Sequence, residues 1–124
     1  MSNSQDLIAV IDDDPEVRAA VASLLFACGY RAHTFDSAET FLVSAPACRA
    51  RCLIVDIQLA DLTGIELARQ LAADGFDFPI IFMTGRDDAT SESQAIAESG
   101  IAFLRKTIPA EVLINAIKRA VGAK

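Results

Sequence analysis

The sequence predicts an α/β fold in which helices cover both faces of a doubly wound, five-stranded parallel sheet. Short apolar runs rich in branched side chains alternate along the chain with segments whose apolar residues recur at helical spacing. Each connection between successive runs is long enough for the right-handed crossover that parallel strands require. A length of 124 residues and a hydrophobic content of 52% suit one domain, which we expect to span residues 1–124.

The first strand and the first helix are predicted at the start of the chain. The strand is the apolar run Leu7 to Ile11, which ends abruptly in three aspartates at 12–14. Asp14 suits the N-cap of a helix and Pro15 its first turn, where a missing N–H costs nothing. We expect Gly29 to end this helix. Its buried face is predicted from apolar residues at steps of three and four, namely Val17, Ala20, Val21, Leu24, Leu25 and Cys28.

The next elements lead to a buried strand that carries one carboxylate at its end. Tyr30 to Phe35 alternates well enough for an edge strand, and Ser37 suits the N-cap of a short helix that runs to about Ser44. The run Cys52 to Asp56 is apolar up to its last residue, which is typical of a strand buried on both faces. Asp56 then lies at the carboxyl end of the strand, where ligands and chemistry collect in open α/β sheets.

The second half of the chain continues the same alternation. After a loop from Gln58 to Thr63, Gly64 is expected to provide a backbone turn that other residues would resist, and a helix follows from Ile65 to Ala73. The remaining predicted elements are a strand at Pro79–Met83 followed by Thr84-Gly85, a weakly packed, mobile helix at Ala89–Ser99, a strand at Ile101–Leu104 followed by Arg105-Lys106, and a helix that starts at Pro109 and buries Leu113, Ala116, Ile117, Ala120 and Val121.

The predicted strand order brings the acidic residues together. We favour the flavodoxin-like order 2-1-3-4-5, in which the first and third strands are neighbours at the point where the winding reverses. Asp12, Asp13 and Asp56 then converge on one crevice. Thr84 and Lys106 reach the same edge of the sheet from the fourth and fifth strands.

Three converging carboxylates predict a cation. They repel one another unless a positive charge neutralises them. Mg²⁺ prefers oxygen ligands and typically binds one or two carboxylates together with phosphate oxygens. A carboxylate beside this ion can attack a phosphoryl group, and the resulting aspartyl phosphate on Asp56 would be assisted by the Lys106 ammonium and the Thr84 hydroxyl.

These motifs resemble the receiver domains of two-component response regulators. The likeness covers nearly all of the chain and lies in an ordered set: an apolar strand that ends in Asp12-Asp13, one that ends in Asp56, one that ends in Thr84-Gly85, and then Lys106. The spacings between them fit as well. The residues around these motifs, and the phenylalanine at position 103, look most like those of receivers that precede LuxR-type helix-turn-helix DNA-binding domains.

The resemblance implies a site and a partner. Asp56 would accept a phosphoryl group from a histidine kinase. Asp13 and Asp56 would bind Mg²⁺ directly and Asp12 through water. The backbone carbonyl of Gln58 would add a further ligand.

The resemblance also implies how phosphorylation is reported. Thr84 and Phe103 would form a switch pair that alters the face made of the fourth helix, the fifth strand and the last helix. We expect this face to control an output, transcription in particular, through an attached or downstream DNA-binding effector, and to form a homodimer on phosphorylation. The chain would be a signalling switch that assists only its own phosphotransfer and dephosphorylation, and not an enzyme.

Two departures from the family pattern favour an alternative. Lys106 is followed by Thr107 where most receivers have proline, and Ala60 stands where the family has a proline four residues after the phosphoacceptor. We expect the first change to favour a trans peptide after Lys106 and the second to loosen the loop after Asp56. Both keep open a degenerate receiver that works as a phosphorylation-independent interaction module.

Two further classes fit the pattern less well. An enzyme of the aspartyl-phosphate phosphatase type usually has a second acid two residues after its nucleophile, where this chain has Gln58. A flavodoxin-like cofactor binder would need a loop that cradles phosphate after the first strand. Here the three aspartates at 12–14 would repel phosphate unless a cation is bound.

The composition limits which partners and which cellular location we expect for the domain. The net charge of −6 argues against direct contact with nucleic acid by this domain, since that contact needs clustered Lys and Arg. The chain has no apolar run as long as a membrane span and no signal peptide at its start, so we expect a soluble, cytoplasmic domain without membrane contact. Cys28, Cys48 and Cys52 are odd in number and form no CxxC pair, which favours reduced thiols over disulfides or zinc.

Overall fold

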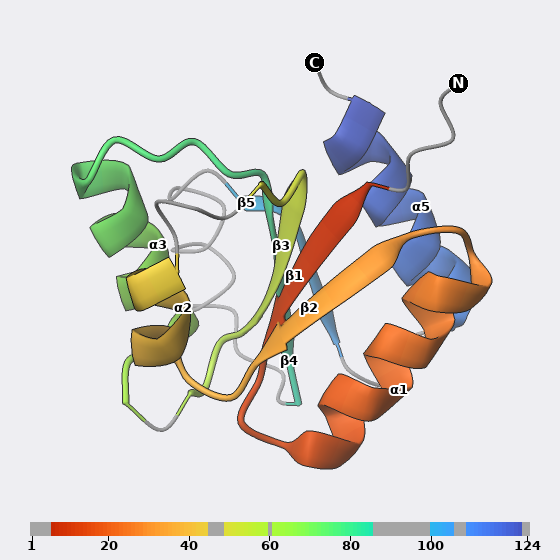
Figure 1. Cartoon of the computed structure of the whole chain (residues 1–124), viewed down its shortest axis with the longest axis horizontal. Helices are drawn as coiled ribbons and strands as arrows, with labels where there is room; N and C mark the ends of the chain where they lie inside the picture. Colours follow the sequence, from red (N-terminus) through yellow and green to blue (C-terminus); the bar gives the residue numbers. More distant parts are fainter. Residues whose placement is uncertain (1–5, 45–48, 60, 86–99, 106–108, 123–124) are drawn as a thin grey trace.

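The computed structural model shows a parallel sheet with helices on both faces (Figure 1). It describes residues 6–44, 49–59, 61–85, 100–105 and 109–122, with the backbone alone at 101–103 and 105. The strand order β2-β1-β3-β4-β5 is the predicted one. The strands are β1 (Leu7–Ile11), β2 (Arg31–Phe35), β3 (Cys52–Asp56), β4 (Ile80–Thr84) and β5 (Gly100–Arg105). The helices in the described ranges are α1 (Pro15–Ala27), α2 (Ala38–Ser44), α3 (Gly64–Ala73) and α5 (Ala110–Gly122). The helix predicted at Ala89–Ser99 lies outside these ranges.

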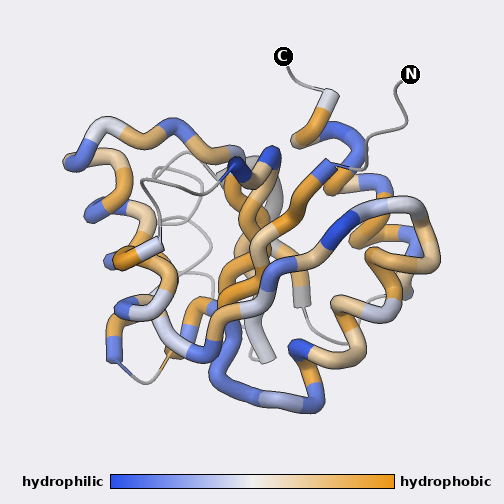
Figure 2. Tube along the Cα trace, in the orientation of Figure 1, coloured by the Kyte–Doolittle hydropathy of each residue, from blue (hydrophilic) through white to orange (hydrophobic). Residues whose placement is uncertain are grey.

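The sheet separates two hydrophobic clusters. Helices α1 and α5 lie on one face and α2 and α3 on the other (Figure 1). Successive strand residues point to opposite faces, so Leu53 and Val55 of β3 join the cluster under α2 and α3, whereas Cys52 and Ile54 join the cluster under α1 and α5. Every residue of β3 is therefore buried, as the uninterrupted apolar run predicted. Figure 2 shows the same contrast, with hydrophobic strands at the centre and a hydrophilic loop after β1.

The cysteines that the structure describes agree with reduced thiols. Cys52 and Cys28 are both free, and Cys48 lies outside the described residues. Burial in β3 raises the pKa of the Cys52 thiol to about 12. This thiol therefore stays protonated and unreactive at neutral pH.

In the part of the chain that the structure describes, no helix is long and apolar enough to cross a membrane.

Helix α1 begins and ends where the sequence predicted. The Asp14 side chain accepts a hydrogen bond of 2.9 Å from the N–H of Glu16, Pro15 is the first helical residue, and Gly29 follows the helix with φ +90°. The predicted buried face was too wide, because Ala20 and Cys28 are exposed. Only one strip of the helix contacts the sheet, with Val21 and Leu25 at its centre. Ala20 lies beside this strip, and Cys28 is already the C-cap.

The last helix buries most of the predicted face. Leu113, Ala116, Ile117 and Ala120 are buried together with Ile114, while Val121 is only partly buried at the helix end. At the other face, the Oγ of Ser37 accepts a hydrogen bond of 3.1 Å from the N–H of Thr40 and so caps α2, as predicted.

Gly64 has a different role from the one predicted. Among the glycines that the structure describes, only Gly29 and Gly75 have a positive φ, so Gly64 supplies no left-handed turn. It is the first residue of α3, and a Cβ atom added there would lie 2.6 Å from the backbone oxygen of Asp56 and 3.0 Å from the Cα of Ile57. A glycine is needed because the helix start lies directly against the end of β3.

The change Gly64→Ala should therefore destabilise the fold. Alanine is the better helix former by about 1 kcal/mol, but the clash is with backbone that cannot easily move. We expect a net loss of about 1–3 kcal/mol in the free energy of unfolding, as for overpacked cores, measured by urea denaturation. Gly122→Ala in α5 is the control, since a Cβ there meets nothing within 4 Å. Equal stability of the two variants would contradict the steric argument.

Candidate functional site

The carboxyl ends of β1 and β3 bring three acidic side chains together. Ile11 lies opposite Val55 in the β1–β3 pairing, so the residues that follow them, Asp12 and Asp56, leave neighbouring strands at the same level. One carboxylate oxygen from each of Asp12, Asp13 and Asp56 lies within 4.8 Å of the other two. Asp12 and Asp56 are only 4% and 5% exposed, whereas Asp13 is exposed. The convergence expected from the strand order is therefore present.

Hydrogen bonds fix the chain at Asp12. Its N–H donates to the carbonyl of Phe35 at 3.1 Å, which continues the pairing with β2. Its carboxylate accepts a bond of 2.9 Å from the N–H of Asp14. The guanidinium of Arg18, on the first turns of α1, donates to the Asp12 carbonyl at 2.8 Å. Arg18 was not predicted from the sequence, because a lone cation six residues after an acid gives no local signal.

A second set of bonds fixes the chain at Asp56. The Asp56 carboxylate accepts a bond of 3.0 Å from the N–H of Gln58. Gln58 also forms an isolated antiparallel bridge with Thr63, and the N–H of Gly64 donates to the carbonyl of Ile57 at 2.7 Å. These contacts join the two ends of the loop after β3. Ala60, from which a looser loop is predicted, lies outside the described residues.

The same loop ends in a helix cap that a short sequence motif marks. Thr63 and Glu66 form a capping box, in which the Thr63 hydroxyl accepts from the N–H of Glu66 at 3.0 Å and the Glu66 carboxylate accepts from the N–H of Thr63 at 2.9 Å. The pattern Thr-x-x-Glu before an apolar helix is a recognised signature, and it could have been read from the sequence.

Asp61 links this loop to a distant element. Its carboxylate accepts hydrogen bonds from the N–H groups of Ala38 at 3.3 Å and Glu39 at 2.9 Å, the first residues of α2, and from Leu62 at 3.0 Å. Burial alone would raise the pKa of Asp61, but these N–H groups favour the charged form and the pKa is lowered below its usual value. A contact across more than twenty residues has no signature in a single sequence.

Thr84 lies at the same edge as Asp56. Asp56 pairs with Met83 across β3 and β4, and Thr84 is the next residue, only 1% exposed. Thr84 in turn pairs with Arg105 in β5, and Lys106 follows Arg105 directly in the chain. Lys106 itself, the departures at Ala60 and Thr107, and the Phe103 side chain lie outside the described part of the structure.

The acidic cluster suits a hard divalent cation. Two of its three carboxylates are buried, and taking charges out of water is costly unless an opposite charge compensates. All the ligand atoms in the cluster are carboxylate oxygens, which Mg²⁺ and Ca²⁺ prefer over the nitrogen and sulfur ligands of zinc. The site can therefore hold Mg²⁺ beside the buried carboxylate of Asp56.

The comparison with known families decides what kind of domain this is. A family model described as the response regulator receiver domain matches residues 8–118. The chain belongs to this family. The prediction of a receiver domain is thereby confirmed, together with its α/β fold.

Several relatives show how this receiver domain compares with known proteins. It is 34% identical over 120 residues to the response regulator protein TmoT of Ectopseudomonas mendocina and 33% identical over 113 residues to the transcriptional regulatory protein FixJ of Rhizobium meliloti. These matches cover 97% and 91% of this chain. The chain spans about half the length of these relatives, 54% of TmoT and 55% of FixJ.

Solved structures agree with this assignment. The crystal structure of FixJ-N matches with a TM-score of 0.90 and 30% identity, covering 98% of this chain and 97% of that one. Full-length FixJ from B. japonicum matches with a TM-score of 0.87 and 32% identity, covering 97% of this chain and 61% of that one.

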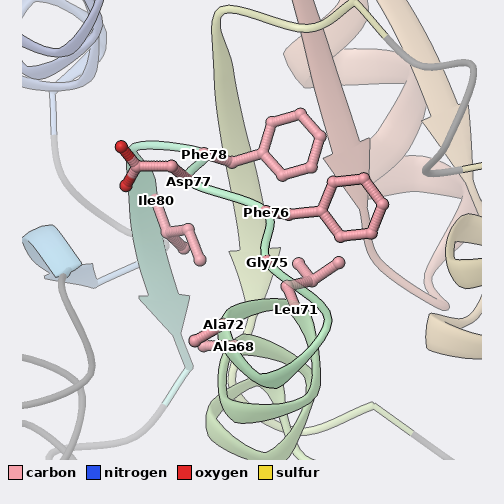
Figure 3. A pocket seen from close by; sticks show the side chains of 8 residues that line it. All are labelled: Ala68, Leu71, Ala72, Gly75, Phe76, Asp77, Phe78 and Ile80. Atoms are coloured by element: carbon pink, nitrogen blue, oxygen red, sulfur yellow. The ribbon is translucent and has the colours of Figure 1, made fainter.

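A pocket of about 270 Å³ lies away from the acidic cluster of the receiver (Figure 3). It is bounded by the last turns of α3, by the stacked rings of Phe76 and Phe78, whose centroids are 5.7 Å apart, and by Ile80 at the start of β4. The start of β4 is at the opposite end of the strand from Thr84. Asp77 is the one ionisable side chain among its lining residues, so this pocket has no cluster of carboxylates like that of Asp12, Asp13 and Asp56.

The clustering of three like charges makes a stability prediction. Asp13→Asn removes one charge, so we expect the free energy of unfolding in EDTA at low salt to rise by up to about 1 kcal/mol. In 1 M NaCl the Debye length falls to about 3 Å, and the gain should shrink. Asp77→Asn, the same change on the exposed rim of the distant pocket, is the matched control in urea denaturation. A gain of equal size in both variants would show that overall charge is responsible.

Proposed function

We propose that this receiver domain is a phosphorylation-driven switch in which Asp56 accepts a phosphoryl group from a histidine kinase. The single observation that carries the proposal is the position of Asp56, a buried carboxylate whose oxygen lies within 4.8 Å of carboxylate oxygens of Asp12 and Asp13. Such a cluster is costly without a cation, and a nucleophile beside a cation is what transfer from a phosphorylated histidine requires.

The residues present fit Mg²⁺ as the cofactor. Asp13 and Asp56 would bind it directly, Asp12 through water, and the Gln58 carbonyl would add a ligand. When bound, the ion neutralises negative charge on the transferring phosphoryl oxygens. The hydrogen bonds from Asp14 and Gln58 to the carboxylates of Asp12 and Asp56 hold two of these groups in place before any ligand arrives.

The chemical step needs little beyond positioning. A carboxylate oxygen of Asp56 forms a bond to phosphorus while the bond from phosphorus to the histidine nitrogen of the kinase breaks, and the freed imidazole takes up a proton. Dephosphorylation is attack of water on the same phosphorus, which returns the Asp56 carboxylate and inorganic phosphate. Lys106 would neutralise the phosphoryl charge, and the Thr84 hydroxyl, at the end of β4, would donate to a phosphoryl oxygen.

The switch would spread from Thr84. The phosphoryl group adds negative charge and acceptor oxygens, Thr84 moves to meet them, and Phe103 turns into the vacated space. Moving an equilibrium from about 1:99 to 99:1 needs about 5.5 kcal/mol of differential interaction. One charge-assisted hydrogen bond contributes roughly 1.5–3 kcal/mol, so Mg²⁺, Lys106 and Thr84 have to act together.

The output would be read from the switch face, which consists of the helix predicted at Ala89–Ser99, β5 and α5. The relatives TdiR and FixJ are transcriptional regulatory proteins by name, and this chain matches only about half of each. This supports transcription as the output, through a DNA-binding effector that is attached or downstream, as the likeness to receivers ahead of LuxR-type domains implies. The net charge of −6 makes the receiver itself a poor partner for DNA.

Phosphorylation is tested most directly by mass. After incubation with acetyl phosphate and Mg²⁺, we expect the intact protein to gain the mass of one phosphoryl group. The gain should be absent in Asp56→Asn and in wild type treated with EDTA. Asp77→Asn, far from the site, should gain mass like the wild type. Wild type without any mass gain would favour the degenerate, phosphorylation-independent module.

The switch face also predicts a change of assembly. Sedimentation velocity of the wild type should show a monomer that becomes a dimer with a phosphoryl mimic and Mg²⁺. Asp56→Asn should stay monomeric in both conditions. A wild type that sediments as an unchanged monomer with and without the mimic would remove homodimerisation from the proposal.

A further inference from the structure

We infer that Asp61 is a positioning residue for the proposed phosphoryl-transfer site, because its carboxylate ties the loop after Asp56 to the start of α2. The inference rests on the proposed function and assigns a role to a residue outside the acidic cluster. It follows from hydrogen bonds that join the loop after Asp56 to α2, which is connected to Asp12 through Phe41 and Phe35.

The first step is the contact itself. The two oxygens of Asp61 accept from different groups: Oδ1 from the N–H of Ala38 and of Leu62, and Oδ2 from the N–H of Glu39. Ala38 and Glu39 open α2, whereas Leu62 belongs to the loop. One carboxylate therefore accepts hydrogen bonds from N–H groups of both α2 and the loop. Bonds from N–H groups to a charged acceptor are stronger than those to a neutral one.

The second step leads from Asp61 to Asp56. Gln58 and Thr63 flank Asp61 in the chain and form an antiparallel bridge with each other. The N–H of Gln58 donates to the Asp56 carboxylate at 3.0 Å, so the same residue supports the proposed phosphoacceptor and contributes the backbone carbonyl proposed as a metal ligand. Because Asp61 lies between the two bridged residues, the hydrogen bonds that hold its carboxylate also restrain the bridge.

The third step leads from Asp61 to Asp12. Helix α2 is packed through Phe41, which is fully buried and meets the ring of Phe35 edge-on at a centroid distance of 5.1 Å. Phe35 ends β2, and its carbonyl accepts the N–H of Asp12 at 3.1 Å. The Asp61 carboxylate thus connects the chain segment beside Asp56 with the segment beside Asp12.

The sequence of the loop explains why such a contact is useful here. Position 60 is alanine where the family has proline, so the backbone restriction that a proline ring imposes is missing. The hydrogen bonds of the next residue, Asp61, restrict the same loop.

The change Asp61→Asn tests this role. Asparagine keeps the shape and one acceptor oxygen but places an NH₂ group where Oδ2 accepts the N–H of Glu39. Affinity for Mg²⁺, measured by calorimetry, should fall about threefold to tenfold, at or below the lower end of the range for groups that support metal ligands. Phosphorylation by acetyl phosphate should slow at low Mg²⁺ and return to the wild-type rate at saturating Mg²⁺, a split that a general loss of stability would not produce.

Asp36→Asn is the matched control. Asp36, like Asp61, is an exposed aspartate that lies outside α2. Its carboxylate accepts a hydrogen bond of 3.2 Å from the hydroxyl of Thr40 in α2, and the change removes the same charge. Equal Mg²⁺ affinities for the two variants would overturn the inference, as would a slower rate of Asp61→Asn at saturating Mg²⁺. Wild type that neither binds Mg²⁺ nor gains mass would instead refute the proposed function, and the role of Asp61 would fall with it.

Discussion

The register of β1 against β3 determines where the charges of this receiver domain lie. Ile11 opposite Val55 puts Asp12 and Asp56 side by side, and a slip of one residue would turn one of the two strands over. Such a slip is opposed on both faces of the sheet, because alternate residues of each strand are buried in two separate clusters. The apolar packing of the strands therefore places the acidic cluster, although none of the packed residues has any part in its chemistry.

The strand register places these aspartates where their charges are unfavourable unless other groups compensate them. A buried carboxylate needs hydrogen bonds or a counter-charge, and the chain supplies N–H groups from Asp14 and Gln58. Arg18 adds a cation whose bond goes to the Asp12 carbonyl. Three like charges within 4.8 Å still repel one another, and a bound cation would reduce this repulsion in the folded chain. A domain whose site is unfavourable when empty gains the most from its ligand, and this suits a switch.

Local patterns predicted most of the fold, and contacts between distant residues account for what they missed. The apolar runs and the caps at Asp14 and Ser37 depend on neighbouring residues, and the convergence of the acids follows from strand order. Helical periodicity identified the buried face of α1 but not its width, so Ala20 was wrongly expected to be buried. Gly64 is required by the oxygen of Asp56, and Asp61 by the start of α2. No pattern in a single sequence reports either contact.

A carboxylate tether and a proline restrict a loop in different ways. Proline limits the backbone in every state of the chain, including the unfolded one. The bonds of Asp61 exist only while α2 and the loop keep their present separation. A ligand shifts a conformational equilibrium only through interactions that differ between the two states. If phosphorylation of Asp56 displaces this loop, the bonds of Asp61 change with it. These bonds therefore make α2 sensitive to any displacement of the loop that follows Asp56.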